Sequence, residues 1–140
     1  MLIVDDQEDD RDILRRLLGR AGVTNRILCL GDGHEVMAYL KGEGEYRNRS
    51  RFPLPAAVFL DLQMPVMNGW QVLDWMRTAG MIEKMRVFVY SQPKNVSEVR
   101  TLYTCGADSF IRKPVMEYEL LDLIRNFPEA WELRAEAEVT

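Results

Sequence analysis

The chain contains few of the residue types that mark disulfide-bonded and metal-binding proteins. Among its 140 residues there are two cysteines, Cys29 and Cys105, and a single histidine, His34. The cysteines form no CxxC pair and no metal-ligand spacing, and both lie in apolar segments, which favours two buried thiols over a disulfide. His34 has no ligand set around it in the sequence, so we expect a surface histidine. Neither a disulfide scaffold nor a cysteine- or histidine-based metal site is therefore predicted.

An excess of basic charge and a long apolar run are also absent. Lys and Arg number 18 against 22 Asp and Glu, which gives a formal net charge of −4 and no electrostatic footprint for DNA or RNA. The longest apolar runs extend over only a few residues, far short of a membrane span. Asp5 and Asp6 arrive too early for a basic and then apolar leader segment. We expect a cytoplasmic protein with no nucleic-acid and no membrane partner.

Short apolar runs alternate regularly with helical patterns along the chain, which has the length of one domain. The predicted strands span residues 2–4, 27–30, 56–60, 87–90 and 109–111. The predicted helices run from 8 to about 19–22, then over 35–41, 69–78, from 95 or 97 to 106, and over 117–126. Two-sided apolar strands that alternate with helices are typical of a parallel sheet covered on both faces. The expected fold class is α/β, with a doubly wound five-stranded parallel sheet.

Two segments depart from this alternation. Residues 42–55 (GEGEYRNRSRFPLP) are rich in Gly, Pro and charge, which predicts a long surface loop. Tyr46 and Phe52 would anchor that loop, and a docking surface that includes its three arginines is the alternative. Residues 128–140 (PEAWELRAEAEVT) form a tail that either extends the last helix after its proline or frays. The sequence leaves both possibilities open, and the domain itself is expected to cover residues 1–127.

Polar residues directly follow four of the predicted strands. They are Asp5 and Asp6 after the first strand, Asp61 after the third, Ser91 after the fourth and Lys113 after the fifth. Ligands of an open parallel sheet bind beyond the carboxyl ends of its strands, so we expect these side chains to meet at one edge. Carboxylates about 4 Å apart repel each other by about 4 kcal/mol at an effective dielectric near 20. Lys113 supplies one compensating charge, and a hard divalent cation would supply the rest.

Mg²⁺ is the predicted cofactor, because it retains several waters and needs only one or two carboxylates plus a phosphate oxygen. Asp6 and Asp61 would be direct ligands, and Asp5 would bind directly or through water. A backbone carbonyl just past Asp61, that of Gln63, would complete the protein's share of the ligands. The expected metal set is therefore Asp5, Asp6, Asp61 and Gln63.

Beside a cation, the Asp61 carboxylate is an anionic nucleophile suited to phosphoryl transfer, which needs mainly positioning and charge neutralisation. Lys113 and the Ser91 hydroxyl would each bind one phosphoryl oxygen. Taken singly, Ser91 is a turn residue, Lys113 a solvated charge, and the two leading aspartates part of a helix cap. Asp61 is different, because it interrupts the apolar stretch AVFLDLQMP, where an unpartnered charge is costly. All of them together, each at a strand end, favour a functional site.

Four motifs closely resemble the receiver domain of two-component response regulators: LIVDDQEDD, VFLDLQMPVMNGWQVL, FVYSQP and DSFIRKPV. The intervals of 30 residues from Asp61 to Ser91 and 22 from Ser91 to Lys113 match the family pattern, and the resemblance covers essentially the whole chain. It implies a flavodoxin-like strand order 2-1-3-4-5. The loop before the third strand resembles that of single-domain regulators related to those that serve bacterial phytochrome kinases.

The resemblance also implies roles for individual residues. Asp61 matches the phosphoacceptor, Lys113 the lysine of a Lys-Pro motif whose peptide bond is usually cis, and Ser91 the switch hydroxyl. Phe110 matches an aromatic switch, although a permanently buried strand residue is an equal alternative. The family commonly has a small residue after the switch hydroxyl, whereas this chain has Gln92.

The function implied is that of a phosphoacceptor response regulator in a phosphorelay. It would take a phosphoryl group from a sensor histidine kinase or a phosphotransfer protein onto Asp61, and would catalyse only its own phosphorylation and dephosphorylation. Its output would be altered protein contacts, through the fourth helix, fifth strand and fifth helix. Homodimerisation through that surface is a further expectation.

Three alternative functions differ from this one in what they require of the sequence. An aspartyl-phosphate hydrolase usually has a second acid two residues after its nucleophile, where this chain has Gln63. A flavodoxin-like cofactor binder needs a phosphate cradle after the first strand, but the acidic stretch at residues 5–10 would repel phosphate. A receiver-like scaffold that acts independently of phosphorylation is distinguished only by experiment.

Overall fold

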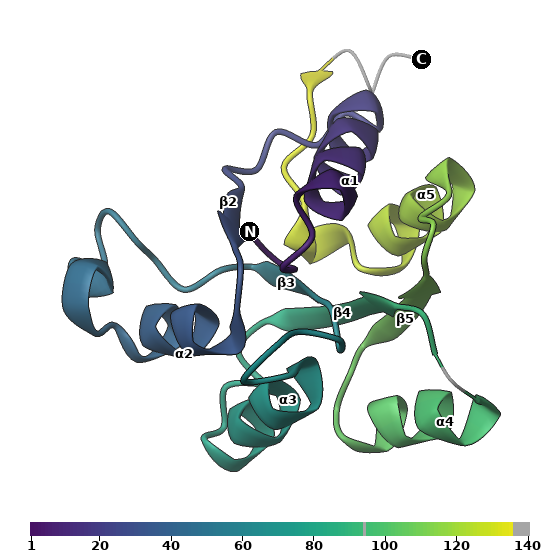
Figure 1. The fold of residues 1–140 in the computed structure, drawn as a ribbon. Coiled ribbons are helices and arrows are strands. Elements are labelled where there is room, and N and C mark those ends of the chain that lie inside the picture. Colours follow the sequence, from purple (N-terminus) through teal and green to yellow (C-terminus); the bar gives the residue numbers. More distant parts are fainter. Residues whose placement is uncertain (94, 136–140) are drawn as a thin grey trace.

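Five strands alternate with five α-helices in the computed structural model, which describes residues 1–93 and 95–135 (Figure 1). The strands are β1 (Leu2–Val4), β2 (Leu28–Leu30), β3 (Ala57–Leu60), β4 (Arg86–Ser91) and β5 (Ser109–Arg112). The helices are α1 (Glu8–Arg20), α2 (Gly33–Lys41), α3 (Gly69–Thr78), α4 (Val96–Thr104) and α5 (Glu117–Asn126). Short 3₁₀ helices lie at Gly44–Tyr46 and Pro128–Ala130. The predicted elements are all present, with ends that shift by at most two residues.

The strands form one parallel sheet in the order β2-β1-β3-β4-β5, as the resemblance implied. Helices α1 and α5 cover one face, and α2, α3 and α4 cover the other (Figure 1). Successive strand residues point to opposite faces, so Ile3 enters the core under α1 and α5 while Leu2 and Val4 enter the other. Both faces are buried, which explains why the strands are apolar throughout rather than alternating.

The register of the sheet brings the strand ends level with one another. Val4 pairs with Leu60, and Leu60 pairs with Val89. Ser91 pairs with Arg112 at the end of the last ladder. The residues that follow β1, β3 and β5 therefore emerge at one edge of the sheet, next to the last residue of β4.

The loop at residues 42–55 is anchored by an aromatic cluster and by one arginine. Tyr46 is buried, and its ring lies 5.0 Å from that of Tyr39 and 5.3 Å from that of Phe52. Arg49 donates hydrogen bonds to the carbonyls of Tyr39 (2.8 Å) and Leu40 (2.6 Å). The two aromatic anchors are confirmed, and Arg49 serves to hold the loop against the end of α2.

The chain turns back after α5 instead of continuing the helix. Trp131 is buried and stacks on Phe88, with ring centroids 5.7 Å apart. The amide of Thr24 donates to the carbonyl of Glu132 (2.7 Å), beside an antiparallel bridge between Val23 and Leu133. Residues 136–140 of the predicted tail lie outside the described residues.

Three smaller expectations can also be compared with the structure. Cys29 and Cys105 are both free, but they are partly exposed rather than buried. His34 is exposed on α2, as expected. Across residues 1–93 and 95–135, no helix combines the length and the apolar character that crossing a membrane requires.

Candidate functional site

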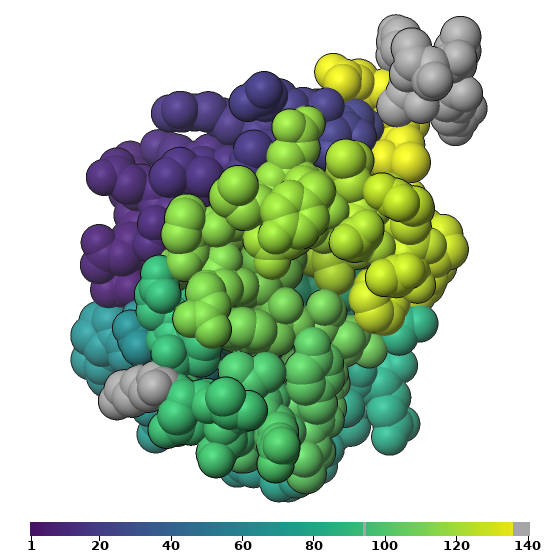
Figure 2. Space-filling view, turned by 90° about the vertical axis from the view of Figure 1, so that its right-hand side faces the viewer, coloured from purple at the N-terminus to yellow at the C-terminus, as the bar shows by residue number. Residues whose placement is uncertain are grey.

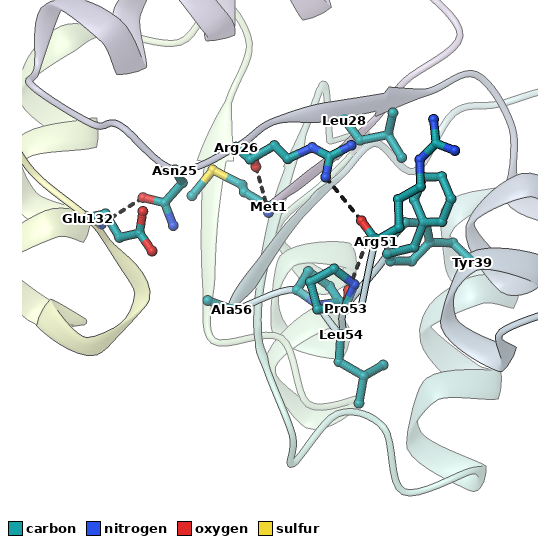
Figure 3. Close-up of a pocket in the computed structure, with 12 residues that line it drawn as sticks. Met1, Asn25, Arg26, Leu28, Tyr39, Arg51, Pro53, Leu54, Ala56 and Glu132 are labelled. Carbon is teal, nitrogen blue, oxygen red and sulfur yellow. Dashed lines mark hydrogen bonds between the residues drawn. The ribbon is translucent and has the colours of Figure 1, made fainter. Parts of the chain in front are cut away.

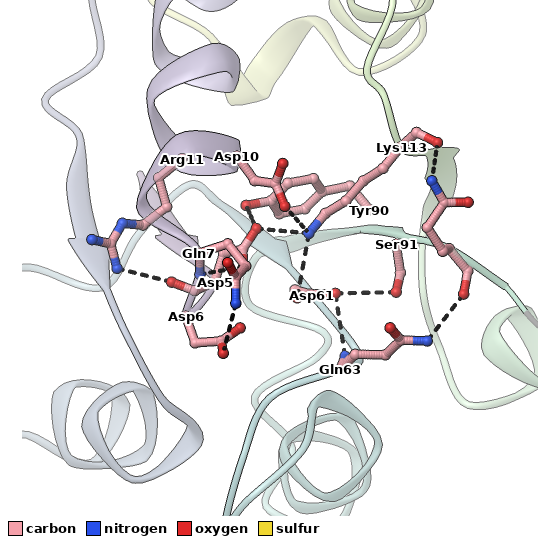
Figure 4. A network of polar contacts seen from close by, with 11 residues as sticks. Asp5, Asp6, Gln7, Asp10, Arg11, Asp61, Gln63, Tyr90, Ser91 and Lys113 are labelled. Carbon is pink, nitrogen blue, oxygen red and sulfur yellow. Dashed lines mark hydrogen bonds and ion pairs between the residues drawn. The ribbon is translucent and has the colours of Figure 1, made fainter.

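The polar residues predicted from the strand ends come together at the carboxyl edge of the sheet (Figure 4). One carboxylate oxygen each from Asp5, Asp6 and Asp61 lies within 4.8 Å of the other two. The side chain of Asp5 is fully buried, and Asp61 and Ser91 are 3% and 1% exposed. Burying carboxylates this close together is costly unless positive charge or hydrogen-bond donors compensate.

The backbone places Asp61 by fixing both sides of it. Its amide donates to the carbonyl of Val4 (2.9 Å), which extends the β1–β3 ladder by one residue. The chain then folds back so closely that a Cβ on Gly69 would collide with the Asp61 carbonyl. Only glycine fits at that position, and α3 begins there with a capping box between Asn68 and Gln71.

Lys113 supplies the central positive charge of the site. Its Nζ lies 2.8 Å from Asp5 Oδ2, 3.0 Å from Asp10 Oδ2 and 3.4 Å from Asp61 Oδ2. Burial is the largest single influence and lowers the pKa of the Lys113 ammonium, but the hydrogen bonds to Asp5 and Asp10 together with the charges of Asp61 and Asp5 raise that pKa overall. The lysine is therefore held charged between three carboxylates.

Asp61 combines burial with a set of donors on one of its oxygens. The Ser91 hydroxyl donates to Asp61 Oδ1 (3.1 Å), and the backbone amide of Gln63 donates to the same oxygen (3.2 Å). Burial raises the pKa of Asp61 to about 6; the Lys113 charge opposes this rise and the Asp5 charge adds to it. The other oxygen, Oδ2, faces Lys113.

Two residues of the site were not singled out from the sequence. Asp10 lies in the acidic first turn of α1, a place typical of a helix-capping residue, yet its carboxylate binds Lys113. Tyr90 lies at the end of a predicted apolar strand, yet its buried hydroxyl donates to Asp5 Oδ2 (2.8 Å). Burial, followed by the charge of Asp5, raises the pKa of the Tyr90 hydroxyl, which keeps it protonated. A tyrosine within the otherwise apolar run VFVY was the available signal.

Two glutamines cross the mouth of the site. The side chain of Gln63 donates to the Gln92 carbonyl (3.2 Å), and the side chain of Gln92 donates to the Lys113 carbonyl (2.6 Å). The loops after β3, β4 and β5 are thus linked to one another. The peptide bond between Lys113 and Pro114 is cis, as the resemblance implied.

Phe110, the residue matched to an aromatic switch, lies on β5 beside Val89 of β4. It is partly buried and packs against the core on the face covered by α2, α3 and α4. This position is compatible both with a switch and with a permanent core residue.

A separate pocket of about 240 Å³ lies at the opposite, amino-terminal end of the strands (Figure 3). The Met1 ammonium there donates to the Arg26 carbonyl, and the Arg26 guanidinium donates to the Arg51 carbonyl, each at 3.0 Å. The guanidinium groups of Arg26 and Arg51 also lie over the ring of Phe52. These polar groups already have partners within the protein, so the pocket offers no comparable chemistry.

Comparison with known proteins identifies the family of the chain. The family described as the response regulator receiver domain matches residues 1–125. The chain is 33% identical over 126 residues to the sensory/regulatory protein RpfC of Xanthomonas campestris, covering 89% of this chain but 16% of RpfC. It is 24% identical over 131 residues to the response regulator Rcp1 of Synechocystis, covering 94% of this chain and 87% of Rcp1.

Solved structures with the same fold include regulators associated with phytochromes. The bacteriophytochrome response regulator RtBRR superposes with a TM-score of 0.82 at 27% identity, covering 96% of this chain and 80% of RtBRR. The phosphorylated cyanobacterial phytochrome response regulator RcpA gives 0.74 at 28% identity, covering 93% and 91%. A Mn²⁺-bound form of Rcp1 gives 0.77 at 25% identity, covering 96% and 97%. The chain belongs to the response regulator receiver domain family.

Proposed function

We propose that this protein is a phosphoacceptor response regulator that receives a phosphoryl group on Asp61. The donor would be the phosphohistidine of a sensor histidine kinase or of a phosphotransfer protein. The observation that carries the proposal is a buried Asp61 carboxylate held between Lys113, the Ser91 hydroxyl and two further acids. In the transfer, an Asp61 oxygen forms a bond to phosphorus while the phosphorus–nitrogen bond breaks. The leaving imidazole keeps that electron pair and gains a proton.

The acidic residues fit a hard divalent cation, and Mg²⁺ is the ion we propose. Three carboxylate oxygens within 4.8 Å of one another match the oxygen ligands that Mg²⁺ prefers. Asp6 and Asp61 would bind it directly, Asp5 directly or through water, and the Gln63 carbonyl would complete the set. When bound, the ion supplies charge neutralisation for the transferring phosphoryl group. The Mn²⁺-bound form of the relative Rcp1 supports a divalent ion here.

The residues of the chain would then hold the phosphoryl group through separate oxygens. The Lys113 ammonium already faces Asp61 Oδ2 and would bind one phosphoryl oxygen. The Ser91 hydroxyl, which now donates to Asp61 itself, would donate to another. That exchange of partners would move the end of β4 and the loop that follows, and Phe110 on the neighbouring strand would respond.

The proposed output surface consists of α4, β5 and α5, the face shown in Figure 2. Exposed apolar side chains gather on it: Val96 and Tyr103 on α4, Met116 just before α5, and Tyr118 and Leu121 on α5. Exposed apolar side chains that gather on one face mark a contact surface, whereas scattered ones do not. A changed protein contact, including homodimerisation, would therefore be read out at this face.

Direct detection of the modified aspartate tests the proposal. The protein is incubated with a small phosphodonor and Mg²⁺ and analysed by mass spectrometry. We expect one phosphoryl adduct, stable in acid and labile in base, which is lost in Asp61→Asn and on chelation of the metal. An adduct that persists in Asp61→Asn would place the nucleophile elsewhere. No adduct at all would favour a scaffold that acts without phosphorylation.

A further inference from the structure

Tyr90 lies beneath the acidic site and contacts two of its charged groups. The residue is 1% exposed, and its ring packs in the core between the sheet and helices α1 and α5. Its hydroxyl donates to Asp5 Oδ2 at 2.8 Å. The Lys113 Nζ lies 4.8 Å from the centre of its ring. The hydroxyl is therefore a neutral donor placed inside a cluster of carboxylates.

The acceptor positions of Asp5 are almost fully occupied by protein donors. Oδ2 accepts from both Tyr90 and Lys113, and Oδ1 accepts from the backbone amide of Gln7 at 2.9 Å. A carboxylate has about four acceptor positions in total. The protein thus fills both positions on Oδ2 and leaves one on Oδ1 for any other partner.

We propose that Tyr90 is a positioning residue that restrains Asp5 and so weakens the binding of a divalent cation at this site. The inference rests on the Mg²⁺ site of the proposed function. Without a cation, the Tyr90 hydroxyl stabilises the buried Asp5 charge together with the Lys113 ammonium. A cation that binds the Asp5 carboxylate weakens this hydrogen bond. Because the bond stabilises the metal-free protein more than the metal-bound protein, its removal raises the affinity for the cation.

The first test compares two tyrosine variants of the full chain. Tyr90→Phe removes the hydroxyl but keeps the ring that supports Lys113. Tyr39→Phe is the matched control, because Tyr39 is also buried and its hydroxyl also donates at 2.8 Å, to the Pro53 carbonyl far from the acids. Both variants are titrated with MgCl₂ by isothermal titration calorimetry.

Tyr90→Phe should bind Mg²⁺ about 3- to 10-fold more tightly than the wild type. In this variant the charge-assisted hydrogen bond from Tyr90 no longer competes with the cation for the Asp5 carboxylate. Tyr39→Phe should leave the Mg²⁺ affinity unchanged while also losing some stability. Unchanged or weaker Mg²⁺ binding by Tyr90→Phe would overturn the inference. A purely structural role would alter stability in both variants without this change in affinity.

A second measurement is made on the wild-type protein and does not depend on the folding of Tyr90→Phe. Tyrosine is labelled with ¹³C at Cζ, and the Tyr90 resonance is assigned by elimination with Tyr→Phe variants at the other four tyrosines. Saturation with Mg²⁺ should shift the Tyr90 resonance and leave that of Tyr39 in place. A Tyr90 resonance that does not move would overturn the inference. Absence of Mg²⁺ binding to the wild type up to tens of millimolar would instead overturn the proposed metal site, and this inference with it.

Discussion

The Asp61 carboxyl is held in surroundings that disfavour its own charge when no cation is present. Burial is the main cause, and the nearby Asp5 charge adds to it, whereas Lys113 opposes both. A cation that binds between Asp5 and Asp61 would reverse this balance by favouring the carboxylate. The charge state of Asp61 and the occupancy of the site are thus coupled.

The stability of the metal-free protein should depend on pH through Asp61. Its pKa in the folded protein is raised from 3.8 to about 6. The stabilisation from this group is therefore fully present below 3.8, the pKa of Asp61 in the unfolded chain, and is lost as the pH rises through about 6. Between pH 7 and pH 4 the free energy of unfolding should gain on the order of 2 kcal/mol from this group. Urea unfolding with a chelator present measures it.

Asp61→Asn provides the control for this measurement. The variant cannot lose a proton at position 61, so it should be more stable than the wild type at pH 7 and should lose that advantage towards pH 4. A constant difference between the two proteins across this range would contradict the assignment of the titration to Asp61.

The sequence was sufficient to predict the residues of the site that follow directly after a strand. Asp5, Asp61 and Lys113 could be placed because parallel strands bring their carboxyl ends together. Asp10 and Tyr90 could not, because their positions depend on the rotation of α1 and on which face of β4 points towards Asp5. Those two quantities are set by tertiary packing, so the tyrosine within VFVY marks an unusual strand residue without identifying its partner.

The end of α2 shows how one element depends on a distant side chain. Gly42 adopts a left-handed conformation (φ 71°) and ends the helix. The carbonyls of Tyr39 and Leu40 in its last turn then accept hydrogen bonds from Arg49 of the following loop. The same guanidinium donates to the Phe52 carbonyl. One arginine therefore links the last turn of α2 to Phe52 of the aromatic cluster.

Arg49→Ala should lower the free energy of unfolding by about 1–2 kcal/mol, because three carbonyl acceptors each lose one donor. Arg47→Ala, in the same loop at an exposed position, should change the stability by less than about 0.5 kcal/mol. Urea unfolding at pH 7 compares the two variants. Equal effects would show that Arg49 is not the anchor of the loop.

The existence and order of the helices and strands were predictable because their apolar periodicities are strong. The loop at residues 42–55 was recognised by its Gly and Pro content, and its aromatic anchors by their type. The role of Arg49 was not predictable, since three arginines alternate along that loop and only the fold distinguishes them. The return of the chain after Pro128 was likewise undetermined, because the proline ends a helix without specifying the direction that follows.

Residues far apart in the sequence close the face of the sheet covered by α1 and α5. Trp131 stacks on Phe88 and lies 6.1 Å from the ring of Phe59, at the centre of that core. Beside it, the chain pairs with the loop between α1 and β2 through Thr24 and Glu132. The segment after α5 is thus part of the core of the whole molecule.

Trp131→Ala should lower the free energy of unfolding by about 3–5 kcal/mol, because it removes a large buried ring and leaves a cavity against Phe88. Leu133→Ala, two residues away and 38% exposed, should cost much less. Chemical denaturation followed by circular dichroism compares them. Similar stabilities for Trp131→Ala and the wild type would show that this segment is dispensable for the core.

The long loop joins the sheet at the start of β3, whereas the acids lie beyond the finish of β1 and β3. Adding or removing residues in that loop would leave the hydrogen-bonded ladder, and hence the spacing of the carboxylates, unaltered. A single residue inserted within Ala57–Leu60 would instead turn every later side chain of the strand to the opposite face. Tolerance of length changes in this fold therefore depends on whether they fall in the loop before a strand or within the strand itself.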